Sequence, residues 1–177
     1  MNILLFSGSF HQKSYSLAIL REIESQISTH TCFIPALDAL PFYSEDISGD
    51  NKPPIILRFL EQVSLADGIV LCSPEYNHSI PGVLKNALDW ASRPAFNSPL
   101  KDKPISIITQ SVSGVGGARA QAHLKLVLDS TMSKIHISHE MMIPAVNKKF
   151  DAEFKLIDSK TRQNISRHIK DFMGSLG

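Results

Sequence analysis

The sequence predicts an α/β fold, a doubly wound parallel sheet of five strands with helices on both faces. Short apolar runs typical of buried strands alternate with segments of helical periodicity along most of the chain. The connections that follow the apolar runs are short, so most of these runs lead quickly toward a helix. Helices between strands provide the right-handed crossovers that parallel strands require.

The chain begins with a strand, a helix and a second strand. Residues 3–7 and residues 31–34 are short runs with the composition of strands. Ser14 or Ser16 can cap a helix that extends to about residue 28, because a serine oxygen accepts a hydrogen bond from the free N–H groups of a first turn. The apolar side chains between these limits recur at helical spacing.

The middle of the chain repeats this pattern around a strongly apolar strand. A polar, turn-rich connection over residues 39–52 leads into a helix over residues 53–66, where two prolines fit the first turn. Residues 68–72 read as a buried strand, and residues 83–91 as the helix that follows it. A loop over residues 93–103 comes next.

The last part of the chain adds two strands and two helices. Residues 105–109 are expected to form the fourth strand and residues 134–137 the fifth, with a helix over 117–130 between them. A C-terminal helix is expected over residues 154–172, and residues 138–150 carry no clear pattern. Five strands with short strand-to-helix loops fit the flavodoxin-like order, in which ligands bind beyond the carboxyl ends of the strands.

Bulk properties describe an ordinary globular chain. Its 177 residues suit a single domain spanning residues 1–177, and the net charge of +1 gives no indication of a nucleic-acid or membrane partner. No run is long enough to span a bilayer, and because the first residues lack a basic-then-apolar pattern, we expect no signal peptide. Cys32 and Cys72 lie in expected strands and fit no metal motif, so we interpret them as core residues of a cytoplasmic protein.

The loop after the first strand has the chemistry of an anion site. Ser9, Ser14 and Ser16 offer hydroxyl groups, and His11 offers a ring donor that can carry charge. The free N–H groups and positive end of the following helix add to this preference, which best suits a phosphate. A capped helix after a turn is the simpler interpretation, so the loop alone leaves both open.

The loop after the third strand offers groups suited to a flat heterocycle. Tyr76 can stack on a ring, Asn77 has an amide donor and acceptor, and the backbone at Glu75 can reach a ring edge after the bend at Pro74. A surface aromatic and a turn residue are the simpler interpretations of single positions. We assign four residues of the next helix to packing or a subunit contact: Lys85, Asn86, Asp89 and Trp90.

The loop after the fourth strand is rich in glycine. Ser111 opens it, and Gly114, Gly116 and Gly117 let the backbone approach a ligand closely. Backbone N–H groups at such a bend favour an electron-rich edge, for example the N1–C2 carbonyl region of a flavin. Glycine-rich turns are common, so the three loops together carry more weight than this one.

At these positions the chain resembles the NADPH-dependent FMN reductase family, whose members include quinone, chromate and azo-dye reductases. The most specific match is Pro74-Glu75-Tyr76-Asn77, followed by residues 79–87 and by Asp89-Trp90. The glycine-rich loop from Ser111 to Arg119 also matches. The family's first loop reads Gly-Ser-x-Arg-x-x-Ser-x-Asn. Here Ser9 and Ser14 match, whereas His11 replaces the arginine and Ser16 the asparagine.

The resemblance implies an oxidoreductase that holds FMN without a covalent bond. NAD(P)H would pass a hydride to flavin N5, and a quinone-like, flavin or other small acceptor would then be reduced in the same pocket. No side chain need act as a catalytic residue, and no metal is expected. The resemblance also implies a homodimer or homotetramer. The cofactor-binding set is then Ser9, His11, Ser14, Ser16, Pro74, Glu75, Tyr76, Asn77, Ser111, Gly114, Gly116 and Gly117.

The exchange of arginine for His11 has a physical consequence. Arginine stays charged and binds phosphate through a fork, whereas histidine loses its charge near neutral pH. We therefore expect weaker FMN binding that weakens further as pH rises. Two alternatives remain, an FMN-binding electron carrier and a flavin-poor binding or regulatory protein of the same fold. The near-neutral charge speaks against the first, because such carriers are typically acidic.

Overall fold

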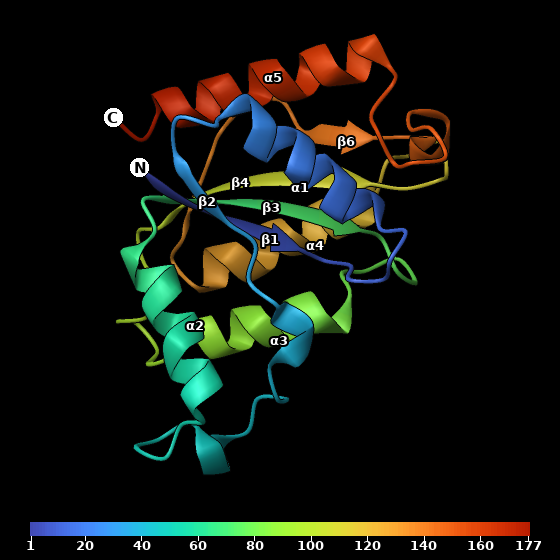
Figure 1. Ribbon diagram of the computed structural model, residues 1–177. Coiled ribbons are helices and arrows are strands. Elements are labelled where there is room, and N and C mark those ends of the chain that lie inside the picture. The colour runs from blue at the N-terminus through green and yellow to red at the C-terminus, as the bar shows by residue number, and fades with distance from the viewer.

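The structure, a computed structural model, describes residues 1–177 and contains one parallel sheet. The strand order is β2-β1-β3-β4-β5, and a sixth strand, β6, also pairs with β4, which confirms the flavodoxin-like order predicted from the sequence (Figure 1). The strands are β1 (Asn2–Ser7), β2 (Thr31–Phe33), β3 (Gly68–Pro74), β4 (Pro104–Gln110), β5 (Lys134–Ile135) and β6 (Met141–Ile143). The helices are α1 (Tyr15–Gln26), α2 (Pro54–Leu65), α3 (Gly82–Ala91), α4 (Ala118–Ser130) and α5 (Ser159–Gly174).

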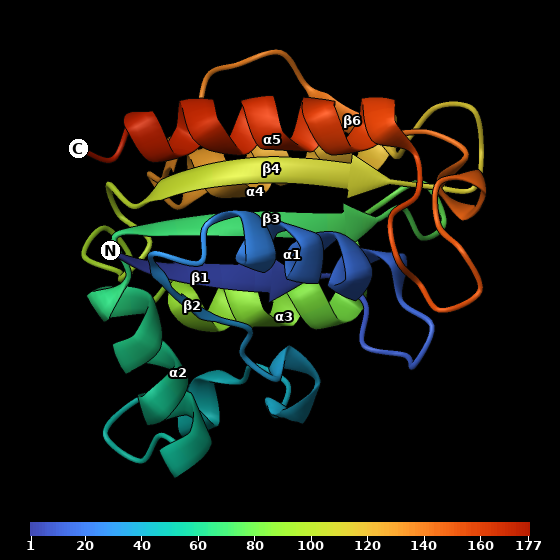
Figure 2. The same ribbon diagram turned by 45° about the horizontal axis from the view of Figure 1, so that its top comes forward.

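Helices cover both faces of the sheet. In Figure 2, α1 and α5 lie on one side of the strands, and α2, α3 and α4 lie on the other. Alternate residues of each strand enter the two cores: Leu4 and Ile69 pack toward α2 and α3, whereas Leu5 and Val70 pack toward α1 and α5. Every residue of β3 is buried, as expected of a central parallel strand that has helices on both faces.

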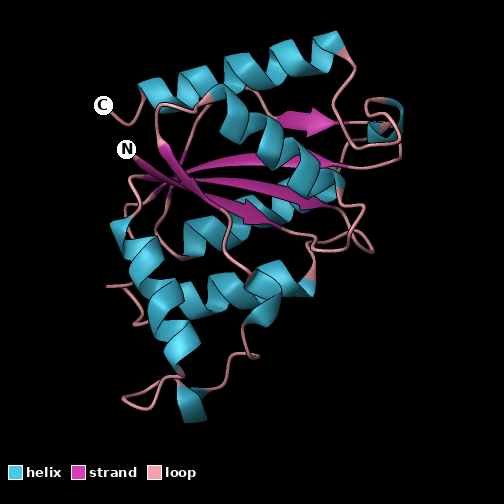
Figure 3. Ribbon diagram, viewed as in Figure 1, coloured by secondary structure: helices cyan, strands magenta, loops and turns pink.

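The fifth strand is interrupted, which the sequence did not predict. β5 ends at Ile135, two residues before the expected boundary, and pairing with β4 resumes only at Met141. The last bond of the first piece joins the His136 N–H to the Ile105 carbonyl at 2.8 Å. Residues 137–140 make no backbone–backbone hydrogen bond, so this segment leaves the sheet before β6 returns to it (Figure 3).

The C-terminal helix begins later than predicted. Phe154, the expected first residue, has a φ of 60°, a value that a right-handed helix does not allow. The Asp158 side chain accepts a hydrogen bond from the Thr161 N–H at 2.8 Å and caps the helix there. No helix of the structure is both long enough and apolar enough to cross a membrane.

Side chains of helix α3 form hydrogen bonds with the long connection that precedes α2. The Asn86 side chain accepts a hydrogen bond from the Tyr43 N–H at 2.8 Å and donates one to the Pro41 carbonyl at 3.0 Å. The Trp90 indole N–H donates to the same carbonyl at 2.8 Å, and its ring is fully buried. These contacts agree with the packing role expected for Asn86 and Trp90, and within this chain Lys85 pairs with Asp89 at 2.7 Å.

Candidate functional site

Three loops meet at the carboxyl edge of the sheet. Ser7 at the end of β1 lies opposite Cys72 of β3, and Pro74 at the end of β3 lies opposite Gln110 of β4. Because these parallel neighbours end level with one another, the loops that follow them leave the sheet side by side (Figure 1). The three loops singled out in the sequence are therefore neighbours in the structure.

Gly8 brings the first two loops into close contact. Its N–H donates to the Cys72 carbonyl at 2.8 Å, and a Cβ at this position would lie 2.7 Å from the Ser73 Oγ. Any side chain would therefore push the loop after β1 away from β3. Gly8 was not among the residues predicted for the site, although a glycine directly after a strand is a signal of such an approach.

The loop after β1 presents unpaired donors at a helix N-terminus. The backbone N–H groups of Gln12, Ser14 and Tyr15 have no acceptor within the protein. Ser14 caps α1, because its Oγ accepts a hydrogen bond from the Leu17 N–H at 3.2 Å, and it donates to the Ser9 carbonyl at 3.0 Å. An anion at this point would meet free N–H groups and the positive end of a 12-residue helix.

His11 and Ser16 are placed differently from the two other predicted residues of this loop. The His11 ring is exposed, and its Nδ1 accepts a hydrogen bond from the Lys13 N–H at 3.2 Å, which leaves Nε2 as the free donor. Ser16 is completely buried, and its hydroxyl accepts from the Gln110 side chain at 3.2 Å. The Ser16 hydroxyl thus joins α1 to β4, and only its backbone N–H remains for a ligand.

The loop after β3 is a tight turn that contacts the loop after β1. Tyr76 and Ser79 exchange two backbone hydrogen bonds of 2.9 and 3.0 Å, and Asn77 and His78 between them have φ values of 49° and 65°. Positive φ at both central positions is the geometry of a type I′ turn, which asparagine tolerates well. The Tyr76 hydroxyl donates to the Ser9 Oγ at 3.4 Å, and the ring is about half exposed.

The Glu75 side chain points to α4 instead of the centre of the three loops. Its Oε2 accepts from the backbone N–H of Arg119 at 2.9 Å and of Ala120 at 3.3 Å. Desolvation of the carboxyl raises its pKa, but these bonds, with weaker contacts from the side chains of His78 and Arg119, outweigh that effect and hold the pKa of Glu75 below its usual range. Its charge therefore stabilises the first turn of α4.

The fold itself requires glycine at two of the three predicted positions after β4. Gly116 and Gly117 have φ values of 63° and 83°. A Cβ at Gly116 would lie 3.0 Å from the Met142 Cβ, and one at Gly117 would lie 3.0 Å from the Thr109 Cβ. The N–H groups of both glycines have no acceptor within the protein. Gly114 has a negative φ and open space around it.

Ser111 opens this loop and helps to hold it. Its N–H donates to the Ile143 carbonyl of β6 at 3.1 Å, and its hydroxyl lies 2.7 Å from the Ser113 hydroxyl. The short strand β6, which the sequence did not predict, therefore holds the first residue of the glycine-rich loop through a backbone hydrogen bond.

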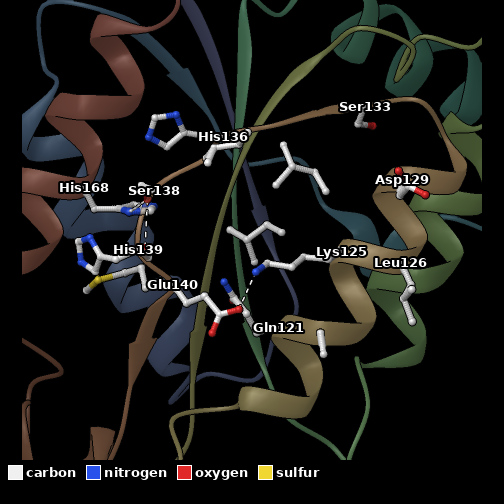
Figure 4. A pocket seen from close by; sticks show the side chains of 15 residues that line it. Gln121, Lys125, Leu126, Asp129, Ser133, His136, Ser138, His139, Glu140 and His168 are labelled. Atoms are coloured by element: carbon white, nitrogen blue, oxygen red, sulfur yellow. Dashed lines mark hydrogen bonds and ion pairs between the residues drawn. The ribbon is translucent and has the colours of Figure 1, made fainter.

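A cavity of ≈770 Å³ lies away from the three loops, between α4 and the interruption of the fifth strand (Figure 4). Lys125 and Glu140 form an ion pair of 2.6 Å across it. His168 is buried at its far side, bonded to the hydroxyls of Ser106 at 2.7 Å and Ser138 at 3.2 Å. Burial, aided by the nearby histidines, lowers the pKa of His168 to about 4.

The cysteines agree with the core role expected from the sequence. Both are free thiols; Cys72 is fully buried and Cys32 half-buried. Burial raises the pKa of the Cys72 thiol to about 12, so the reactive thiolate is suppressed.

A family model described as NADPH-dependent FMN reductase matches residues 1–148 of the chain. The chain belongs to this family. It is therefore an oxidoreductase, and the chemistry of this family depends on FMN and NAD(P)H. The match includes all three loops of the carboxyl edge, and it confirms the resemblance seen in the sequence.

Similar proteins from bacteria span nearly the same length as this family member. The NAD(P)H-dependent FMN reductase of Pseudomonas aeruginosa is 36% identical over 173 residues, which covers 96% of this chain and 92% of the relative. A quinone reductase of Escherichia coli is 31% identical over 176 residues, with 97% and 93% covered. In structure, the flavoenzyme NAD(P)H:(acceptor) oxidoreductase FerB of Paracoccus denitrificans matches with a TM-score of 0.87, at 26% identity and coverage of 99% and 96%.

The residues of the carboxyl edge fit the family's FMN. A phosphate suits the unpaired N–H groups before α1, and the carbonyl edge of a flavin ring suits those at Gly116 and Gly117. Between these two ends stands the half-exposed Tyr76 ring. Arg119 was not among the predicted site residues, and the structure places it beside Glu75 at the start of α4.

Proposed function

We propose that FMN binds across the three loops of the carboxyl edge and that the chain passes electrons from NAD(P)H to a quinone-like acceptor. The observation that carries this proposal is the set of unpaired backbone N–H groups at both ends of the edge, before α1 and at the glycine-rich loop. The phosphate would lie at the first end and the flavin ring at the second. The carboxyl edge of the sheet therefore offers hydrogen-bond donors at one end for the phosphate of FMN and at the other end for the carbonyl groups of its ring.

Every predicted residue except Glu75, whose side chain points to α4, has a part in this arrangement. Ser9, Ser14 and His11 face the phosphate, with the backbone N–H of Ser16. Pro74 ends β3 and sets the direction of the turn, and Tyr76 and Asn77 lie along the ring. The glycine-rich loop meets the pyrimidine edge of the ring, through the backbone of Ser111, Gly114, Gly116 and Gly117.

The protein's contribution is position and electrostatics. When bound, FMN accepts two electrons from NAD(P)H and delivers them to an acceptor. The helix N-terminus and His11 Nε2 hold the phosphate, and the N–H groups of the glycine-rich loop favour negative charge at the ring edge that they face. No acid or base side chain is required, and we assign no catalytic residue.

The names of the relatives support a quinone-like acceptor. The Escherichia coli relative is named a quinone reductase, and a relative from Burkholderia sp, 34% identical, is named 2-hydroxy-1,4-benzoquinone reductase. A quinone is flat and can occupy the face of the flavin ring that NAD(P)H leaves. We therefore propose a quinone as the first acceptor to assay, with free flavin as a further acceptor.

We further propose that residues 1–177 act as one FMN-binding domain in a cytoplasmic homodimer or homotetramer. Apolar side chains stand exposed beside the proposed site: Tyr76, Val112 and Val115 are 48%, 67% and 52% exposed. A second copy that covers them would exclude water from the flavin ring and strengthen its electrostatic contacts.

Steady-state oxidation of NADPH and NADH, with FMN and a benzoquinone, tests the function. We expect oxidation that requires both FMN and quinone. FMN uptake without turnover would indicate an electron carrier, and no FMN uptake would indicate a flavin-poor binding protein.

A matched pair of variants tests the location of the site. Ser14→Ala removes the cap of α1 at the phosphate end, whereas Ser25→Ala changes the same residue type at the far end of that helix. FMN affinity should fall about fivefold in the first variant and stay unchanged in the second. Equal affinities would contradict the location.

A further inference from the structure

Helix α4 is capped by a residue from another loop. Its N-cap position is Gly117, which has no side chain to accept a hydrogen bond. Instead the Glu75 carboxylate, 44 residues earlier in the chain, accepts from the N–H groups of Arg119 and Ala120 at 2.9 and 3.3 Å. The Glu75 side chain is only 10% exposed, so water replaces this contact poorly.

Two other helices, α1 and α5, use a cap from their own sequence. Ser14 accepts from the Leu17 N–H at the start of α1, and Asp158 accepts from the Thr161 N–H at the start of α5. Those caps stabilise one helix each. The Glu75 cap differs because it also joins two separate loops, the turn after β3 and the glycine-rich loop after β4.

We infer that Glu75 is a positioning residue that fixes the spacing of the two loops that hold the flavin ring, without touching the ring itself. This inference rests on the proposed function. Glu75 directly precedes Tyr76, whose hydroxyl donates to Ser9 of the first loop. Its carboxylate accepts from the N–H of Arg119, two residues beyond Gly117 of the third loop. The adjacent side chains of Glu75 and Tyr76 therefore connect the turn after β3 to both of the other loops.

The helix N–H groups matter more to this link than the side chains around it. The Arg119 guanidinium lies 3.4 Å from Glu75 Oε1 and is 55% exposed, and the His78 ring lies 3.5 Å away and is 75% exposed. Exposed pairs at such distances contribute little. The two backbone bonds lie at a helix N-terminus, where a carboxylate also meets the helix dipole. A neutral side chain that can accept the same bonds should keep most of the link.

Three variants and three measurements test the inference. Glu75→Ala removes the link, and Glu75→Gln keeps an oxygen that can accept both N–H groups. Asp158→Ala removes a cap of similar strength from α5, on the opposite face of the sheet. The measurements are the FMN dissociation constant, from flavin fluorescence, hydrogen exchange of the Arg119 and Ala120 amides in protein without FMN, and the melting temperature.

We expect Glu75→Ala to weaken FMN binding about tenfold and to speed exchange at both amides, with substantial recovery in Glu75→Gln. Asp158→Ala should lower the melting temperature to a similar extent but leave FMN affinity within about twofold. Glu75→Ala that binds FMN as the wild type does would overturn the inference while leaving the proposed function intact. A wild type that binds no FMN would instead overturn the proposed function, whatever the exchange data show.

Discussion

The two ends of the proposed flavin site are built in opposite ways. At the phosphate end, before α1, the backbone N–H groups are unpaired and the His11 ring is exposed. At the ring end, the turn after β3 is fastened to α4 through Glu75, and Gly116 and Gly117 pack tightly against β6 and β4. The difference teaches that charge and free donors control how tightly FMN is held, whereas a rigid frame controls how its ring is oriented.

The largest expected effect comes from disrupting the contact at Gly8, where the loop after β1 meets β3. Gly8→Val would force a side chain against the Ser73 hydroxyl, which a Cβ alone would approach to 2.7 Å. We expect a loss of about 3 kcal/mol in the free energy of unfolding and loss of FMN binding. Gly49→Val is the control, because a Cβ there meets nothing within 4 Å. Equal stability of the two variants, by urea denaturation, would show that the ends are not held together at Gly8.

The second-largest expected effect is on the pH dependence of stability, and it comes from His168, which lies far from both ends of the proposed site. Folded protein keeps the buried His168 neutral down to about pH 4, whereas the unfolded chain protonates it near pH 6.5. The unfolded state then binds more protons in this window, so stability falls as pH falls, by roughly 3 kcal/mol from this residue at pH 4. The groups around it are His136, His139 and Asp171.

The variant His168→Asn tests how much His168 contributes to the loss of stability at low pH. It should start less stable at pH 7, because the bonds to Ser106 and Ser138 are lost, and should lose less stability than the wild type on acidification to pH 4.5. FMN affinity of the folded protein at pH 7 should not change. Parallel losses in wild type and variant would contradict the assignment.

The phosphate end offers a change that strengthens binding. His11→Arg places a permanent charge beside the unpaired N–H groups, and we expect FMN affinity to rise about tenfold at pH 8. Fluorescence titrations of the wild type and the variant at pH 8 test this. An affinity that does not change in the variant would place His11 outside the phosphate contacts.

The smallest expected effect concerns the hydroxyl that joins the ends. Tyr76→Phe removes the donor to Ser9 but keeps the ring, and the 3.4 Å distance indicates a weak bond. We expect FMN binding to weaken only about twofold. Tyr76→Ala, which also removes the ring, should weaken it about tenfold. Similar losses in both variants would mean that the hydroxyl, not the ring, is the important group.

Local patterns predicted the central strands well because β1, β3 and β4 are largely apolar and buried over their own length. The carboxyl-edge loops followed from that order, since neighbouring parallel strands end level. The interruption at residues 137–140 could not be predicted, because it depends on how this segment meets α4 and α5. The start of α5 was misplaced because helical periodicity extends past its cap at Asp158.

Side-chain direction was the harder part of the site. Glu75 and Ser16 sit in the expected loops, yet both point to partners far away in the sequence, at Arg119 and Gln110. A sequence pattern gives the loop in which a residue lies, but such distant contacts decide where its side chain points. Gly8 was missed for the same reason, since its constraint comes from Ser73 on the neighbouring strand.

The most direct test of FMN binding at the carboxyl edge is the visible absorption spectrum of the purified protein, recorded without oxygen before and after addition of FMN and then NADPH. Flavin bands that shift on binding to the wild type, and bleach with NADPH, are the expected result, with binding lost in Gly8→Val and retained in Gly49→Val. A wild type whose spectrum does not change with FMN, or a Gly8→Val variant that binds as the wild type does, would contradict binding at these loops.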